Sequence, residues 1–206
     1  PTPRGNSVIT TSYVDANLFH DLISGRSVTG ILHLLNLTPI DWYSKLQTTV
    51  ETATFGSEYV AARTCTEQII DLRLTLRYLG VPIDGPSFMF GDNESVVNTA
   101  AVPHSKLHKR HNALSYHRTR EAIAAGITRF HHIVGTTNPS DILSKHWAHV
   151  DIWDTLRPLM FWHANTSSST LNTDKEEQVE QVSKTTSPIS NETDQASSET
   201  LPHRGE

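Results

Sequence analysis

The sequence contains a single cysteine, Cys65, among its 206 residues. One cysteine cannot form an internal disulfide, and it excludes a thiolate-rich zinc site, so the sequence fits a reducing compartment. No run of about 18 apolar residues is present, and we therefore expect no membrane span. A charged leader followed by an apolar segment is also missing, so no secretion is expected. Because the sequence begins with Pro1, we expect a fragment of a longer product.

Aromatic side chains are missing from residues 164–206, which are rich in Ser, Thr, Glu, Gln and Asn. Such a segment cannot bury enough apolar surface to offset the entropy lost on ordering, so we predict a disordered tail. The tail holds eight of the 22 Asp and Glu residues but three of the 17 Lys and Arg residues, which accounts for the whole net charge of -5. The overall acidity therefore says little about what residues 1–163 bind.

The body before the tail alternates between strand and helix patterns. β-branched and aromatic runs predict strands, and long runs without Gly or Pro that end at a glycine predict helices. The predicted strands are 8–14, 28–35, 40–50, 87–90 and 127–134, and the predicted helices are 54–79, 95–101, 105–125 and 140–147. The order βββαβααβα predicts an α/β fold with a mixed sheet covered by helices, in which the second and third strands pair antiparallel.

We divide the chain into four parts. Residues 1–7 form a lead-in, residues 8–149 form the domain, residues 150–163 dock on it, and residues 164–206 form the tail. In the docking segment, Pro158 is expected to break any continuous helix. The four tryptophans are most simply core or edge anchors: Trp42, Trp147, Trp153 and Trp162.

Four acidic residues lie at the ends of predicted elements or on a core face. Glu58 begins an apolar helix face that continues through Ala62 and Cys65. Asp15 and Asp92 follow predicted strands that would meet at one sheet edge if they are parallel neighbours, and Asp141 opens a helix. Taken singly, a helix-end or turn role is the simpler interpretation of each acid. Taken together they predict a cation site, because hard divalent cations relieve the repulsion between crowded carboxylates.

Six blocks of the sequence make the pattern more specific. They are "YVDAN", "GRSVTGILHLLN", "IDWYSKLQTTVETATFGSEYVAA", "GDNESVV", "KRHNALSYHRTREAIAAG" and "NPSDILSKHW". In order and spacing they resemble the ribonuclease H domain of Ty1/copia-type retrotransposon polyproteins, over roughly residues 8–147. The resemblance implies a ribonuclease H-like fold, with a mixed five-stranded sheet and flanking helices.

The resemblance also implies an activity. Family members hydrolyse the RNA strand of an RNA–DNA hybrid during reverse transcription, with two Mg²⁺ ions, for which Mn²⁺ can substitute. The family's metal-binding acids fall on Asp15, Glu58, Asp92 and Asp141. An upstream reverse transcriptase domain and a cytoplasmic, virus-like-particle location follow by the same resemblance, whereas the oligomeric state does not.

The sequence departs from the family pattern in two places: the first is harmless because Glu58 keeps its position, and the second leaves an alternative open. Gly56 stands where many members carry a second Glu, and the loop before Asp141 lacks the histidine found in cellular and retroviral relatives, for which His131 and His132 are poor substitutes. The alternative is a catalytically inactive, transposon-derived domain that keeps the fold and binds nucleic acid. An integrase of the same fold group fits less well, because its sites usually rest on three acids.

A basic segment, residues 106–120, contains five Lys and Arg residues, three His residues and no acid. A solvated surface is the ordinary interpretation, but a basic helix on a neutral body also suits a polyanion. We predict phosphate contacts with the hybrid from Lys106, Lys109, Arg110, Arg118 and Arg120. A zinc site on His104, His108 and His111 is a weaker alternative, since no fourth ligand is evident.

Overall fold

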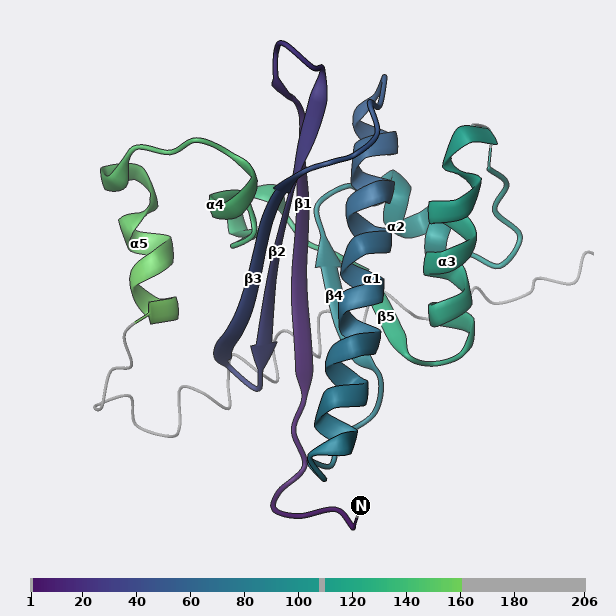
Figure 1. Ribbon diagram of the computed structural model, residues 1–206, viewed down its shortest axis with the longest axis vertical. Coiled ribbons are helices and arrows are strands. Elements are labelled where there is room, and N and C mark those ends of the chain that lie inside the picture. The colour runs from purple at the N-terminus through teal and green to yellow at the C-terminus, as the bar shows by residue number, and fades with distance from the viewer. Residues whose placement is uncertain (1, 108–109, 161–206) are drawn as a thin grey trace, which may run out of the picture. The chain divides into compact units, whose positions relative to one another are not determined.

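The computed structural model describes residues 2–107 and 110–160 (Figure 1). The predicted tail and Trp162 lie outside these residues, as do Lys109 and His108. None of the helices within the described ranges is long and apolar enough to cross a membrane.

A single five-stranded sheet forms the centre of the described structure, with the strand order β3-β2-β1-β4-β5. The first three strands pair antiparallel, and β4 and β5 continue the sheet in parallel with β1. The strands are β1 (Thr10–Asp21), β2 (Arg26–Leu35), β3 (Thr38–Leu46), β4 (Ser87–Gly91) and β5 (Thr128–His132). The predicted mixed sheet is confirmed, and so is the parallel pairing that brings the strands of Asp15 and Asp92 together.

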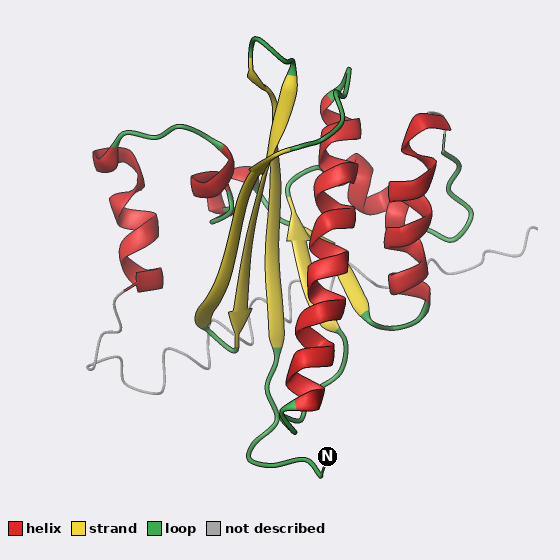
Figure 2. Cartoon of the chain, viewed as in Figure 1, coloured by secondary structure: helices red, strands yellow, loops and turns green. Residues whose placement is uncertain are grey.

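Helices flank this sheet on both sides (Figure 2). The α-helices are α1 (Thr54–Tyr78), α2 (Glu94–Ala101), α3 (Ala113–Ala124), α4 (Asp141–Ser144) and α5 (His149–Met160), with two short 3₁₀ helices, η1 (Arg110–Asn112) and η2 (Gly135–Thr137). The core forms where α1 packs on β1 and β2, and it includes Val14, Ile31, Tyr59, Cys65 and Ile69, each at most 2% exposed. The helix face predicted from Glu58 onward is therefore the buried face.

Several predicted boundaries were wrong, among them the end of the third strand, predicted at residue 50 and found at Leu46. β1 continues to Asp21 because antiparallel pairing with β2 supplies hydrogen-bond partners well past residue 14. The helix predicted at 105–125 begins only at Ala113, because side chains of α3 bind the carbonyl groups of the preceding loop. The last predicted body helix, 140–147, is reduced to the single turn of α4.

The described part of the docking segment, residues 150–160, is helical, and α5 contacts β3. Pro158 lies inside α5, so the predicted helix break is wrong. A proline removes one backbone hydrogen bond, and α5 continues past it to Met160, the last described residue.

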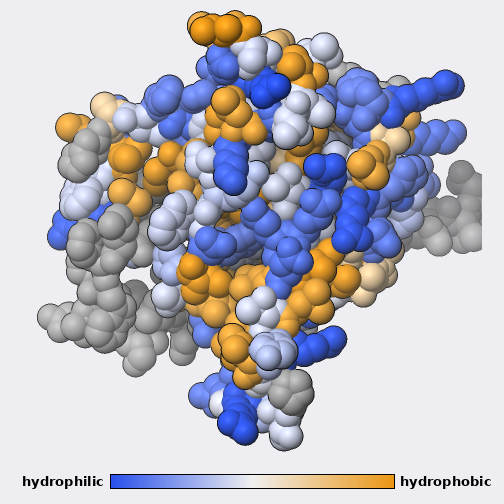
Figure 3. All heavy atoms as spheres, in the orientation of Figure 1, coloured by the Kyte–Doolittle hydropathy of each residue, from blue (hydrophilic) through white to orange (hydrophobic). Residues whose placement is uncertain are grey.

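The tip of the β1–β2 hairpin is the most exposed apolar feature of the described chain. Leu22 and Ile23 are 89% and 99% exposed there, and Figure 3 shows hydrophobic residues at the top of the molecule in this view. Elsewhere on that face hydrophilic and hydrophobic residues are mixed, with hydrophobic residues gathered across its lower part.

Candidate active site

Asp15 was predicted to follow the first strand, but in the structure it lies within β1. The residue is 1% exposed, and the Ser144 hydroxyl donates a hydrogen bond to its carboxylate. Burial raises the pKa of Asp15 from 3.8 to about 6, against the opposing effect of the Ser144 hydrogen bond. Removal from water penalises the charged form, so this carboxylate favours either a proton or a cation.

Glu58 lies in the first turns of α1 and is 6% exposed. Burial raises the pKa of Glu58 well above its ordinary value, and the nearby charges of Asp15 and Asp92 raise it further. The backbone N–H of Ala16 donates a hydrogen bond to its carboxylate, which acts in the opposite direction. A helix-dipole role at a frayed end does not describe this residue, because the carboxylate is buried against β1.

Asp92 follows β4 directly, at the position where the strand leaves the sheet. Burial raises the pKa of Asp92, as does the charge of Asp141. Gly91, just before Asp92, and Gly135, which packs against it, leave little space for side chains. A Cβ on Gly91 would lie 3.1 Å from Phe130, and a Cβ on Gly135 would lie 3.1 Å from Asp92 Oδ2. Close packing around this strand end therefore holds the Asp92 carboxylate near the other acids.

Asp15, Glu58 and Asp92 form one cluster, which we call the acid cluster. One carboxylate oxygen from each lies within 4.8 Å of the other two. The residues come from β1, α1 and the end of β4, so only the folded chain brings them together. Three crowded oxygen donors fit a hard divalent cation such as Mg²⁺, which prefers carboxylate oxygens. The raised pKa values of all three acids fit the same interpretation, because a cation would relieve their repulsion.

Asp141, the fourth predicted acid, lies beside the acid cluster but outside it. It opens α4, and its Oδ1 lies 2.7 Å from the Lys145 ammonium. Its charge raises the pKa of both Asp15 and Asp92, which indicates proximity. The structure thus brings three predicted acids together and places the fourth next to them, paired with a lysine.

Sequence reasoning missed three residues that arrange this site. Ser144 donates to Asp15, Lys145 pairs with Asp141, and Asn138 donates a hydrogen bond of 3.0 Å to the Val14 carbonyl. All three lie within "NPSDILSKHW", the block that had supplied Asp141. Their polarity in a segment that packs on the sheet was the available signal.

The basic segment contains less free charge than its composition predicts. Lys106 and Arg110 are exposed, whereas Arg118 forms an ion pair of 2.9 Å with Glu121. The Arg120 guanidinium donates to the carbonyls of Thr99, Val102 and Pro103 and to the Ser105 hydroxyl, and it lies over the Tyr116 ring. We therefore withdraw Arg120 as a phosphate contact, because its donors already hold the loop that precedes α3.

Among the described residues, neither His104 nor His111 belongs to a group of three or more potential metal ligands. His111 Nε2 lies 3.2 Å from the buried Glu51 carboxylate, and His108 is outside the described residues. A Cβ on Gly56 would collide with that same Glu51 carboxylate. The Glu51 side chain thus fills the space beside Gly56, where the family pattern has a second Glu. Near the acid cluster, His132 forms a hydrogen bond of 3.0 Å with the Asp92 backbone carbonyl.

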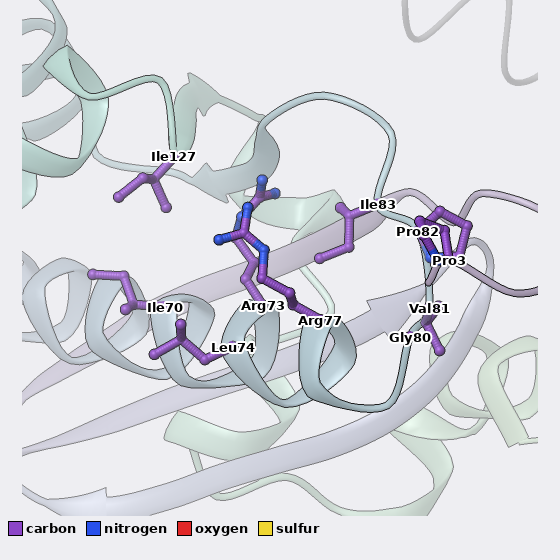
Figure 4. Close-up of a pocket in the computed structure, with 10 residues that line it drawn as sticks. All are labelled: Pro3, Ile70, Arg73, Leu74, Arg77, Gly80, Val81, Pro82, Ile83 and Ile127. Atoms are coloured by element: carbon purple, nitrogen blue, oxygen red, sulfur yellow. The ribbon is translucent and has the colours of Figure 1, made fainter. Parts of the chain in front are cut away.

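The acid cluster is distinct from two cavities in the described chain. One, of about 310 Å³, lies at the C-terminal end of α1 and is lined by Arg73, Arg77 and apolar residues (Figure 4). The other, of about 620 Å³, lies between α2 and α3. None of the four acids lines either cavity.

Comparison with known sequences gives relatives of one kind. No family model matches the chain. The retrovirus-related Pol polyproteins of transposon TNT 1-94 from Nicotiana tabacum and of transposon RE2 from Arabidopsis thaliana are each 28% identical, over 141 and 144 residues. This chain is a homologue of these transposon polyproteins. The resemblance predicted from the six blocks is confirmed.

The homology covers much more of this chain than of its relatives. The matches include 68% and 69% of this chain but 10% of each polyprotein. This chain therefore spans about a tenth of the length of the Pol polyproteins it matches.

A solved structure supports the fold. The N-terminal RNase H domain of Rv2228c from Mycobacterium tuberculosis, solved as a fusion with maltose-binding protein, matches with a TM-score of 0.52 and 12% identity. The match covers 74% of this chain and 98% of that one. The predicted ribonuclease H-like fold is thereby confirmed.

Proposed function

We propose that this chain is the ribonuclease H domain of a transposon Pol polyprotein and hydrolyses the RNA strand of an RNA–DNA hybrid. The observation that carries this proposal is the acid cluster, in which β1, α1 and the end of β4 of a ribonuclease H fold deliver three carboxylates to one place. The homology to Pol polyproteins supports it, since reverse transcription produces such hybrids. An upstream reverse transcriptase domain and a cytoplasmic, virus-like-particle location belong to the same proposal.

The acid cluster and Asp141 would hold two divalent ions, Mg²⁺ by preference or Mn²⁺. When bound, such ions activate a water for in-line attack on a phosphodiester and stabilise the oxygen that leaves. The chain's own contribution is to hold the carboxylates in place. Ser144 fixes Asp15, the Ala16 N–H fixes Glu58, and tight packing at Gly91 and Gly135 fixes Asp92.

Hybrid binding would come from the exposed cations near α3. Lys106 and Arg110 are free to reach phosphates, and Arg118 can do so if it leaves Glu121. Lys109, outside the described residues, remains part of the proposed contact. These groups touch phosphates without reading bases, so binding should depend on hybrid shape and salt and not on sequence.

RNA release from an end-labelled hybrid tests the proposal. Wild type should cleave with Mg²⁺ and stop with a chelator. Asp92→Asn should reduce the rate by more than about a hundredfold, because even groups that only support metal ligands cost 10- to 100-fold when removed. Glu94→Gln is the matched control. It removes one negative charge from an exposed side chain two residues after Asp92, and cleavage should continue.

The alternative function, an inactive domain that binds nucleic acid, predicts a different result. Wild type would then bind the hybrid with no RNA release under any metal condition. Cleavage that persists with the chelator and in Asp92→Asn would contradict the metal mechanism itself.

A further inference from the structure

Lys145 places a positive charge inside the candidate active site. Its ammonium lies 2.7 Å from Asp141 Oδ1 and 3.8 Å from Asp15 Oδ2, and its side chain is 36% exposed. The charge of Lys145 lowers the pKa values of Asp15, Glu58 and Asp92, so it acts on the whole acid cluster. A lysine is thus the cation nearest to these acids within the described part of the chain.

The backbone that carries Lys145 is held firmly against the sheet. α4 packs so closely on β2 that a Cβ on Gly30 would lie 2.6 Å from the Ser140 carbonyl oxygen. Ser44 Oγ donates to the Leu143 carbonyl at 2.6 Å, and Trp147 Nε1 donates to the Asp141 carbonyl at 3.0 Å. The backbone of Lys145 is therefore held in place, and only its four-carbon side chain can move.

The site then has two cation positions that share Asp15. One is the acid cluster, where oxygens of Asp15, Glu58 and Asp92 lie within 4.8 Å of one another. The other lies between Asp141 and Asp15, and the Lys145 ammonium holds it. The lysine ammonium is a compact cation on a flexible side chain. It can therefore move out of this position while the backbone of Lys145 stays in place.

We propose that Lys145 is an internal, displaceable cation that reserves the position between Asp141 and Asp15. The first divalent ion binds the acid cluster with Lys145 in place, and the second binds only when the ammonium moves away. Lys145 is a positioning residue in this scheme, and it makes metal loading sequential. The inference rests on the proposed function, because it concerns the same metal site.

Calorimetric titration with Mg²⁺ and with Mn²⁺, without nucleic acid, tests the scheme. Wild type should show one ion binding first and a second binding more weakly. Lys145→Met should strengthen the second phase by about tenfold, since a nearby positive charge is removed. Lys145→Arg keeps the charge and should keep the weak second phase. Lys45→Met, the same change at an exposed lysine on β3, should titrate as wild type.

Thermal melting supplies a second measurement that does not depend on cleavage. In chelator, Lys145→Met should melt below wild type because the acids lose their internal cation, and Mg²⁺ should remove most of that difference. Identical titrations for wild type and Lys145→Met would overturn the inference while leaving the ribonuclease proposal intact. Lys145→Met that weakens both phases would likewise overturn the inference alone, whereas wild type that binds no divalent ion would overturn both.

Discussion

The acid cluster and the basic segment were both predicted from charged residues, but the fold brings the acids together and leaves the cations apart. The acids converge: oxygens of Asp15, Glu58 and Asp92 lie within 4.8 Å of one another although 77 residues separate the first from the last. The cations diverge: Arg118 pairs with Glu121, Arg120 binds carbonyl groups of a loop, and Lys106 and Arg110 remain exposed. Charged residues in the sequence therefore predicted a shared site for the acids but not for the cations.

The length of the side chains explains this difference. Asp15 and Asp92 have short side chains on or beside parallel strands, so strand pairing alone fixes where their carboxylates lie. Arg118 and Arg120 have long side chains that reach several possible partners, and their partners depend on which loops pack nearby. Backbone topology is more predictable from sequence than the end point of a long side chain.

The largest expected effect sharpens the comparison within the basic segment. Arg120→Met should lower the free energy of unfolding by about 3 kcal/mol, because it leaves several half-buried carbonyl groups without their charged donor. Arg118→Met, two residues earlier on the same helix, loses an exposed ion pair and should cost less than about 1 kcal/mol. Urea denaturation of both variants measures this. Equal losses would show that Arg120 is no more structural than Arg118.

A second, intermediate effect concerns the pH dependence of the acid cluster. Asp15 has a pKa raised to about 6 by burial, so folded protein binds more protons than unfolded protein between about pH 4 and 6. Without metal, stability should therefore fall as pH rises through this window. Divalent ions need the deprotonated acids, so stabilisation by Mg²⁺ should appear as pH rises above 6. Melting temperatures with and without Mg²⁺ at pH 5.0 and 7.5 test this, and equal stabilisation at both values would contradict it.

The smallest expected effect concerns salt. Each phosphate contact contributes roughly 0.7–0.9 to the slope of log affinity against log salt concentration. Removing two exposed cations together, in Lys106→Gln/Arg110→Gln, should flatten the slope for hybrid binding by about 1.5. Lys45→Gln, an exposed site on β3, is the control. Should the slope stay unchanged in the double variant, the basic segment is a solvated surface only.

Much of the fold followed from hydrophobic patterns and glycine stops. The boundaries of α1 were predicted within one residue, because Gly80 ends a long run without helix breakers. The start of α3 was wrong because the loop before it is held by Arg120 and Tyr116, contacts that no local pattern reveals. The extension of β1 beyond Asp15 was missed for a similar reason, since pairing with β2 and not local propensity maintains it.

The candidate site was predictable in its acids and not in its supports. Asp15, Glu58 and Asp92 each carry a signal, which is a strand end or a buried helix face. Lys145 carries none, because a lysine four residues after an aspartate is ordinary in a helix. Its approach to Asp15 depends on how closely α4 packs at Gly30, which only the folded structure shows.

The central claim is that Asp15, Glu58 and Asp92 hold a divalent cation. Anomalous diffraction from crystals soaked in Mn²⁺ tests it most directly, since the scattering locates the ion without reference to activity. The account predicts a peak bound by oxygens of all three carboxylates, and its loss in Asp92→Asn. Folded wild-type protein that binds no Mn²⁺ there at saturating concentration, or binds it only elsewhere, would contradict the claim.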